Sequence, residues 1–257
     1  MKLEKISKNA NEMVFSIEGV KPSFVNTLRR VIIDEVPTMA IEDVEFRKNS
    51  STMYDEMIAL RLGLLVLSTD LDSYEFPSEK VPKDSAKASL KLTLSAKGPK
   101  TVYASDIKSA DPKVKPVHGK TPIVKLLEGQ ELEFEATAVL GRGKEHTKWA
   151  PGHAYYMNAA KITIDNDSDL FEEYKSLYPA EVFKDGKIDK SLIVKNNLVD
   201  AVEGVNEEIV KVEFIPDKFV FTVESWGQLD PEEMVNRALD HLSNTADEFA
   251  KTIKSAK

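Results

Sequence analysis

Residues 24–40 read FVNTLRRVIIDEVPTMA, and this stretch decides the fold. The apolar side chains that recur here at helical spacing on one face are Phe24, Val25, Leu28, Val31 and Ile32. Ser23 is the predicted N-cap, since its hydroxyl can accept from the free N–H groups of a first helical turn. Pro37 is predicted to end the helix, because proline lacks a backbone donor and restricts the residue before it. The segment therefore predicts an amphipathic helix.

Alternating apolar and polar residues predict strands on both sides of this helix. The pattern appears upstream at residues 13–17 and downstream at 90–94 and 132–140. Residues 154–164 predict a further strand, whereas residues 111–122, with their prolines and lysines, predict a loop. This mixture of strands and helices places the chain in the α+β class.

The C-terminal region predicts two strands followed by a long helix. Residues 210–214 and 219–223 are the predicted strands, joined by a hairpin-like turn at residues 215–218, IPDK. The helix begins at residues 230–233, DPEE, where the aspartate is the N-cap, the proline takes the first helical position and the second glutamate closes a capping box.

An apolar stripe runs along this C-terminal helix. Its members, three or four positions apart, are Val235, Ala238, Leu239, Leu242, Ala246, Phe249 and Ile253. The helix has about 25 residues, against a usual mean of about 11–12. Periodicity leaves two interpretations open: the stripe packs on the chain's own sheet, or it packs partly on a second chain.

The composition is that of an ordinary globular chain. Its 257 residues suffice for one large domain or two modest ones, with 42% hydrophobic and 30% charged residues. The absence of cysteine excludes disulfides, thiolate catalysis, Cys-ligated zinc and iron–sulfur clusters. The longest apolar run, residues 62–67, is far shorter than the roughly 20 residues that span a bilayer. With no signal-peptide pattern at the start, we expect a cytoplasmic protein without membrane attachment.

The charge balance argues against nucleic-acid binding as the main task. The formal net charge is −8 and the sequence pI is about 5.2. Independent nucleic-acid binders show a basic surplus, because Lys and Arg supply the phosphate contacts. Any contact with DNA is therefore expected to be indirect, through basic partners.

Motifs for catalysis or metal binding are weak. The run Gly141-x-Gly143-Lys144 lacks the spacing and the following Ser or Thr of a phosphate loop, so a glycine turn at a strand end is predicted. His146 and His153 match no standard zinc spacing. No nucleophile triad or tight aspartate cluster for two-metal chemistry is visible in the sequence. We therefore predict no catalytic residue, no metal ligand and no cofactor.

The stretch at residues 24–40 closely resembles the signature helix of the alpha/D family of multisubunit RNA polymerase subunits, with its Asn-x-Leu-Arg-Arg, aliphatic residues, proline and small residue. Residues 61–67 (RLGLLVL), residues 141–151 (GRGKEHTKWAP) and the final helix with its DPEE start resemble the family in the same order. The four stretches span most of the chain. The sequence is thus identified as a member of this family, in its archaeal D form.

This resemblance implies a discontinuous alpha-like dimerisation domain, a mainly β insert domain and a small ferredoxin-like insertion. The dimerisation domain would comprise residues 1–39, 154–165 and 208–257, the insert domain residues 40–153, and the insertion residues 166–207. The family role is that of a non-catalytic assembly subunit. It pairs with a smaller alpha-like subunit, L, and forms the platform for the second-largest and then the catalytic largest subunit, beside other small polymerase subunits.

The resemblance also assigns two sets of contact residues. The signature and C-terminal helices together would meet subunit L, through Phe24, Val25, Leu28, Val31, Ile32, Val235, Leu239, Leu242, Ala246 and Phe249. Docking of the large subunits would involve Arg29, Arg30, Lys144, His146, Lys148 and Trp149. Arginine and tryptophan suit such a role, because the guanidinium binds in a planar fork and tryptophan is enriched at interface hot spots.

One departure from the family concerns iron–sulfur clusters, which many archaeal D subunits hold with cysteines in their insertion. Here Asn197, Asp200 and Glu203 stand at the C-x-x-C-x-x-C spacing, and Tyr178-Pro179 resembles a Cys-Pro. Because thiolates hold such clusters, none is expected here.

Two rival interpretations remain open. The chain is a stand-alone enzyme whose site the sequence does not reveal, or it is an alpha-like homodimer as in bacteria. The bacterial subunit carries a separate C-terminal DNA-binding domain after a linker. This sequence ends at Lys257, straight after the long helix, which favours the archaeal form.

Overall fold

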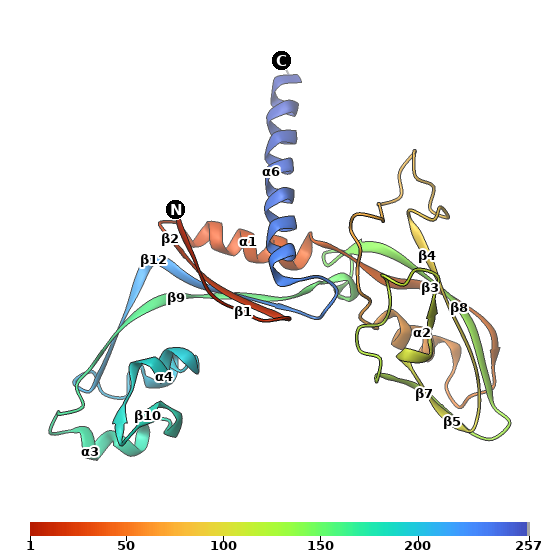
Figure 1. Ribbon diagram of the computed structural model, residues 1–257. Coiled ribbons are helices and arrows are strands. Elements are labelled where there is room, and N and C mark those ends of the chain that lie inside the picture. Colours follow the sequence, from red (N-terminus) through yellow and green to blue (C-terminus); the bar gives the residue numbers. More distant parts are fainter. Residues whose placement is uncertain (256–257) are drawn as a thin grey trace. The chain divides into compact units, whose positions relative to one another are not determined.

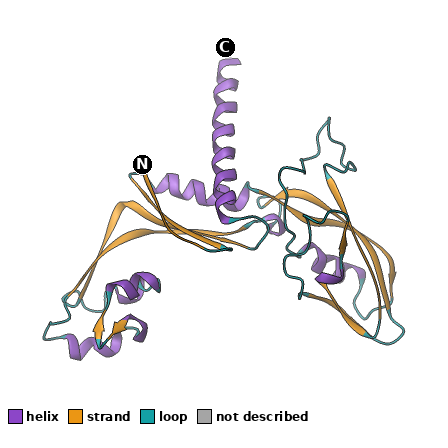
Figure 2. Ribbon diagram, in the orientation of Figure 1, coloured by secondary structure: helices purple, strands orange, loops and turns teal. Residues whose placement is uncertain are grey.

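The computed structural model describes residues 1–255, and Figures 1 and 2 show their helices and strands. The chain divides into two compact units, each built from separated stretches of sequence. The first unit comprises residues 1–4, 15–22 and 156–221, and the second comprises residues 5–14, 23–155 and the chain from residue 222 on.

One four-stranded sheet has the order β1-β2-β12-β9. Its strands are β1 (Lys2–Lys8), β2 (Glu12–Glu18), β9 (Gly152–Ile164) and β12 (Val210–Ser225). The strands predicted at residues 13–17 and 154–164 are confirmed as β2 and β9. In β2, Met13, Phe15 and Ile17 are buried, as their alternation indicates.

The hairpin predicted at residues 215–218 is wrong, because β12 runs through this stretch as one continuous strand. Neighbours on both sides bind its backbone: the Ile215 carbonyl accepts from the Asn158 side-chain amide at 3.1 Å, and the Asp217 carbonyl accepts from the Gly19 N–H at 2.8 Å. Hydrogen bonds to other segments thus override the local turn preference of proline and aspartate.

Two amphipathic helices belong to the second unit. The predicted signature helix is α1 (Pro22–Asp34), and the predicted C-terminal helix is α6 (Pro231–Ser255), with 25 residues. The predicted N-cap Ser23 lies inside α1, because the helix begins at Pro22, whose fixed φ suits a first position. The chain leaves the helical conformation at Asp34, before Pro37, as the proline predicts.

A second sheet in the same unit has the order β3-β8-β4-β6. Its strands are β3 (Pro37–Asn49), β4 (Ser89–Lys97), β6 (Lys108–Ser109) and β8 (Glu131–Arg142). The strands predicted at residues 90–94 and 132–140 are confirmed as β4 and β8. Both pairings of β8 are antiparallel, and Ala138 stands opposite Ile41 on β3 and Leu90 on β4.

Smaller elements complete this region. They are α2 (Asp55–Gly63), the antiparallel pair β5 (Lys100–Tyr103) and β7 (Pro122–Leu126), and the short turns η1 (Ala104–Asp106) and η2 (Thr147–Trp149). One hydrophobic core, drawn from residues 39–140, lies between these elements and the second sheet. The stretch between β6 and β7 is a loop, as predicted.

A small module in the first unit has its own core. Its elements are α3 (Phe171–Tyr174), η3 (Lys175–Leu177), η4 (Ala180–Val182), the hairpin of β10 (Phe183–Lys184) with β11 (Lys187–Ile188), α4 (Lys190–Lys195) and α5 (Val199–Val202). Asp185 and Gly186 join the hairpin with positive φ angles of 51° and 81°, which Asp-Gly turns adopt readily. Its core joins buried residues of these elements to Ile162, Ile209 and Val210.

Candidate interaction surface

Helix α1 buries three of its five residues that are predicted to contact subunit L. Val25 and Ile32 are 0% exposed and Leu28 is equally enclosed within this chain. These three side chains therefore hold α1 in its own fold and offer no surface to a partner. Phe24 is 37% exposed and Val31 is half-buried, so these two of the five residues predicted for the contact on α1 are at least partly open.

The start of α6 is fixed by a cap and by two ion pairs. The Asp230 carboxylate accepts from the Glu232 N–H at 2.8 Å, as the N-cap prediction requires. The Lys8 ammonium lies 2.9 Å from the Asp230 carboxylate and 2.8 Å from that of Glu232. The Glu233 carboxylate binds Arg237, one turn further along α6. Negative charge at this end also suits the helix dipole.

These contacts lower the pKa of both acids. Burial alone would raise the pKa of Asp230, but hydrogen bonds from Lys8 and from the Glu232 N–H outweigh it, so the pKa of Asp230 falls below its ordinary value. Hydrogen bonds from Lys8 and then Lys5 lower the pKa of Glu232. Both carboxylates therefore remain ionised, and bound to lysine, at neutral pH.

The apolar stripe of α6 divides along the helix. In the first two turns, Met234, Val235 and Ala238 are buried in the chain's own fold. From there on the helix is largely exposed: Leu239 is 41% exposed, Leu242 is partly exposed, and every residue from 243 to 255 is exposed. We call Leu239, Leu242, Ala246, Phe249 and Ile253 the seam stripe.

The seam stripe is unusual because of its size and regularity. Phe249 is 67% exposed and Ile253 is 52% exposed. Such side chains rarely gather on the exposed side of one helix unless another surface covers them. The first interpretation is confirmed for the start of the helix, which packs on its own chain through residue 238. Beyond it the helix presents an exposed apolar face, and a second chain that covers this face stays a prediction.

The loop after β8 is used to hold the end of α1. The Lys144 N–H donates to the Asp34 carbonyl at 3.1 Å, and the Lys144 ammonium lies 2.9 Å from the Glu35 carboxylate. A Cβ at Gly143 would lie 2.1 Å from the Ile33 carbonyl oxygen, so the close approach requires glycine. This is a strand-end turn, as predicted, and Lys144 is largely committed to its own chain.

Trp149 is also internal, which removes it as an exposed anchor for a large subunit. Its side chain is enclosed, at 7% exposure for the residue, and its indole N–H donates to the Val139 carbonyl at 3.2 Å. The ring lies against Gly141, where any Cβ would overlap it. Tryptophan packs well in both interiors and interfaces, so its presence in the sequence does not decide between the two.

Lys148 and His146 support this tryptophan. The Lys148 ammonium lies 4.3 Å from the Trp149 ring centroid, donates to the Ile41 carbonyl at 3.1 Å and pairs with the Glu42 carboxylate. The His146 ring accepts from the Lys148 N–H at 3.0 Å and meets the Trp149 ring edge to face. The structure thus brings His146, Lys148 and Trp149 together in one cluster, whereas Lys144 binds the end of α1.

The two arginines of the signature helix differ in how far their side chains are exposed. Arg29 is half-buried and its guanidinium donates to the Asn26 side chain at 3.0 Å. Arg30 is exposed. Of the six predicted docking residues, Arg30, Lys144 and His146 are exposed, and the last two bind groups of their own chain.

The small module does not fit an iron–sulfur cluster. The positions with cluster spacing carry Asn197, Asp200 and Glu203, and thiolates are the ligands such clusters need. Nearby, Tyr178 is a buried core residue whose hydroxyl donates to the Asn206 carbonyl at 3.3 Å. Apolar side chains, with Val202 fully enclosed among them, supply the core of this module.

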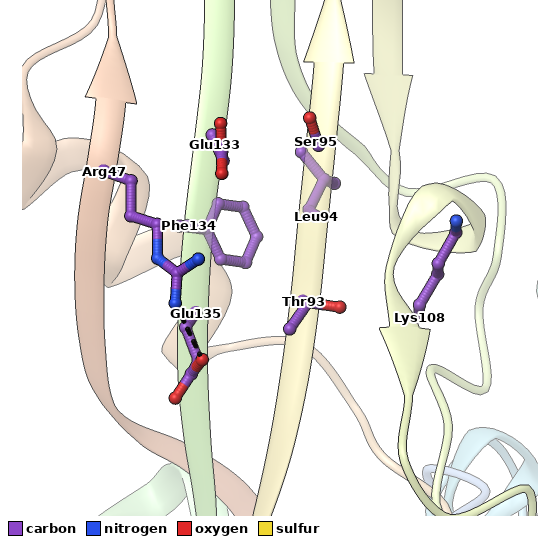
Figure 3. A pocket seen from close by; sticks show the side chains of 8 residues that line it. All are labelled: Arg47, Thr93, Leu94, Ser95, Lys108, Glu133, Phe134 and Glu135. Carbon is purple, nitrogen blue, oxygen red and sulfur yellow. Dashed lines mark hydrogen bonds and ion pairs between the residues drawn. The ribbon is translucent and has the colours of Figure 1, made fainter.

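Surface hollows elsewhere hold ordinary ion pairs. Figure 3 shows one of about 140 Å³ on the sheet formed by β3, β8 and β4. There the Arg47 guanidinium points toward the Glu135 carboxylate, 3.3 Å away, and Lys91 lies 3.2 Å from the same carboxylate. Lys108 stands apart on β6. Exposed pairs of this kind solvate a sheet face, and they do not form a nucleophile–base pair.

Within residues 1–255, no three His, Asp or Glu side chains are grouped so that they could hold a metal ion. Over the same residues, no helix is both long enough and apolar enough to cross a membrane. The feature of the described structure with the clearest functional meaning is therefore the seam stripe.

An α+β fold that exposes the apolar face of a long helix defines the class of proteins that associate with other chains through that helix. The comparisons agree: the family model for the RNA polymerase Rpb3/Rpb11 dimerisation domain matches residues 14–246. The chain belongs to this family, as an alpha-like subunit of the archaeal type of DNA-directed RNA polymerase.

Similar proteins span nearly the whole chain. The DNA-directed RNA polymerase subunit Rpo3 of Pyrococcus horikoshii is 37% identical over 99% of this chain and 98% of the relative. The Rpo3 subunit of Pyrococcus furiosus is 38% identical over 99% and 97%, and that of Thermococcus kodakarensis is 39% identical over 95% and 94%. The resemblance found in the sequence is thereby confirmed.

Proposed function

We propose that this chain is a non-catalytic assembly subunit that forms a heterodimer with the small alpha-like subunit L. The observation that carries the proposal is the seam stripe, an apolar face that continues along α6 after the helix has left its own core. Covering such a face removes large apolar side chains from water, which is the main driving force of stable association. Subunit L, as an alpha-like chain, would supply the matching helices.

The contact we propose is smaller on α1 than on α6. It comprises the seam stripe together with Phe24 and Val31, whose side chains are at least partly open. Val25, Leu28, Ile32 and Val235 contribute indirectly, because they hold the two helices in their own chain. An interface of this kind resembles a domain core shared between two chains.

The heterodimer would then serve as the platform for the second-largest subunit, the catalytic largest subunit and other small subunits. Arg30 is exposed beside the buried face of α1 and suits a contact with a carboxylate or carbonyl of another subunit. We divide the chain into a dimerisation domain (1–39, 154–165 and 208–257), an insert domain (40–153) and an insertion (166–207); residues 256 and 257 lie outside those described. The formal charge of −8 favours indirect contact with DNA.

The active site of the polymerase would lie on other subunits. Nucleotidyl transfer by two metal ions needs a tight cluster of carboxylates. The carboxylates of this chain instead pair with lysine and arginine across strands and helix ends, as Glu135 and Asp230 do. This chain would contribute to catalysis by holding the large subunits in place.

Size-exclusion chromatography with light scattering tests the proposal, on the chain alone and after co-expression with subunit L. We expect a soluble 1:1 complex on co-expression and aggregation of the chain alone, because the seam stripe is then uncovered. A stable monomer that ignores subunit L would overturn the proposal. A stable dimer of the chain with itself would replace it with the homodimer known for the bacterial alpha subunit.

A further inference from the structure

The seam stripe is bordered by residues that carry no charge. At 100° per residue, residues 239–255 of α6 place only apolar and small side chains in an arc of roughly 160°, which runs from Thr252 through Phe249 to Ala250. In the exposed part of the helix the members of this arc are Leu239, Leu242, Thr245, Ala246, Phe249, Ala250, Thr252 and Ile253. The charged residues lie outside this arc: Asp240, Asp247 and Lys251 fall on the opposite side, and Glu248 and Lys254 lie about 40° beyond its two ends.

Two threonines form one border of the stripe. Thr245 lies four residues before Phe249 and Thr252 lies three residues after it, so both are its neighbours on the helix surface. The Thr245 hydroxyl donates to the His241 carbonyl at 2.8 Å, and the Thr252 hydroxyl donates to the Glu248 carbonyl at 2.9 Å. Each donor is thus satisfied within α6, although both side chains are exposed.

This hydrogen bonding determines what the border can pack against. A buried hydroxyl without a partner is costly, but a hydroxyl that donates to its own helix can be covered by an apolar surface without that cost. A helix whose borders are small and uncharged also lets a second helix approach closely. Charged borders, by contrast, are the usual means by which paired helices choose partners through ion pairs.

We propose that Thr245 and Thr252 are part of the contact with the partner subunit, covered by an apolar, uncharged helix face, and that they act by shape and by exclusion of charge. This inference rests on the proposed function and adds the residues that determine which partner helix fits. The family match to a dimerisation domain supports an alpha-like helix of a second subunit as the occupant. The threonine hydroxyls make no hydrogen bond to that partner.

The test uses the purified complex with subunit L, diluted to concentrations near its Kd. Mass photometry then measures the fraction that has dissociated. The double variant Thr245→Val/Thr252→Val keeps shape and removes both hydroxyls, so we expect its Kd to stay within about twofold of wild type. The double variant Thr245→Lys/Thr252→Lys places charge in the contact, and we expect its Kd to rise at least about tenfold. Asp247→Lys, on the charged side of the same helix, is the matched control and should change the Kd less than about threefold.

The variant Phe249→Asp, in the seam stripe itself, tests the proposed function independently of the two threonines. If the valine variant weakens the complex about tenfold, the hydroxyls bind the partner and the inference is overturned. If Phe249→Asp dissociates the complex while the lysine variant does not, the contact is real but excludes the threonine border, and the inference again fails. If Phe249→Asp also leaves the complex intact, the proposed seam itself is overturned.

Discussion

The two parts of α6 carry the same sequence pattern and have different surroundings. Residues 231–238 place their apolar side chains in the chain's own core, whereas residues 239–255 continue the same spacing on an exposed face. The first part contributes to the stability of this chain, and the second has its apolar surface available for another chain. The comparison shows that helical periodicity predicts which side of a helix is apolar, but not which molecule covers it.

The largest effect should follow from a charge in the buried part. Met234 is fully enclosed, so Met234→Asp would bury an unpaired carboxylate. We expect the free energy of unfolding to fall by about 3–5 kcal/mol, measured by urea unfolding followed by circular dichroism. Asn236→Asp, two residues further on and exposed on the opposite side of the helix, is the control and should have little effect. Equal unfolding midpoints for the two variants would show that the first turns of α6 are not packed.

A charge in the exposed part should act on association instead. Phe249→Asp removes a large aromatic side chain from the centre of the seam stripe, and we expect the Kd for subunit L to rise about a hundredfold. The free energy of unfolding of the chain should change by less than about 0.5 kcal/mol, because Phe249 is 67% exposed. Asp247→Ala, on the opposite side, should leave both quantities unchanged. A large loss of stability would mean that the exposed part packs on its own chain after all.

A smaller effect is expected at the boundary where α6 begins. Asp230→Ala removes the carboxylate that accepts from the Glu232 N–H and pairs with Lys8. We expect a loss of about 1 kcal/mol in the free energy of unfolding, which is usual for an N-cap. Asp240→Ala, in the middle of the helix, provides the matched control. An equal loss for both variants would assign the effect to charge in general rather than to the cap.

The smallest expected effect is on how the free energy of unfolding depends on pH. Because the folded chain lowers the pKa of Asp230 and Glu232 below their ordinary values of 3.8 and 4.5, the folded state binds fewer protons than the unfolded state in this range. The stability they contribute is present above pH 4.5 and is lost as the pH falls through the lowered pKa values. Lys8→Met should make unfolding less dependent on pH between about 5 and 3. An unchanged pH profile in urea unfolding would exclude Lys8 as the cause.

Much of the local structure followed from the sequence. The alternation at residues 90–94 and 132–140, and the DPEE start of α6, predicted elements that the structure contains, because these signals depend on near neighbours along the chain. The hairpin at residues 215–218 was predicted from equally local signals and is wrong. There the backbone of Ile215 and Asp217 is bound by Asn158 and Gly19, which lie far away in the sequence.

The interaction surface was predictable only in part. The sequence by itself determined the family, the two amphipathic helices and the apolar stripe. For the helices and the stripe this was possible because side-chain spacing alone decides which residues share a helix face. Only the tertiary structure decided that Val25, Ile32 and Trp149 are enclosed while Phe249 is open. Burial depends on which distant segments pack against a side chain, such as the tight approach of Gly141 to Trp149, and no pattern within one helix or loop contains that information.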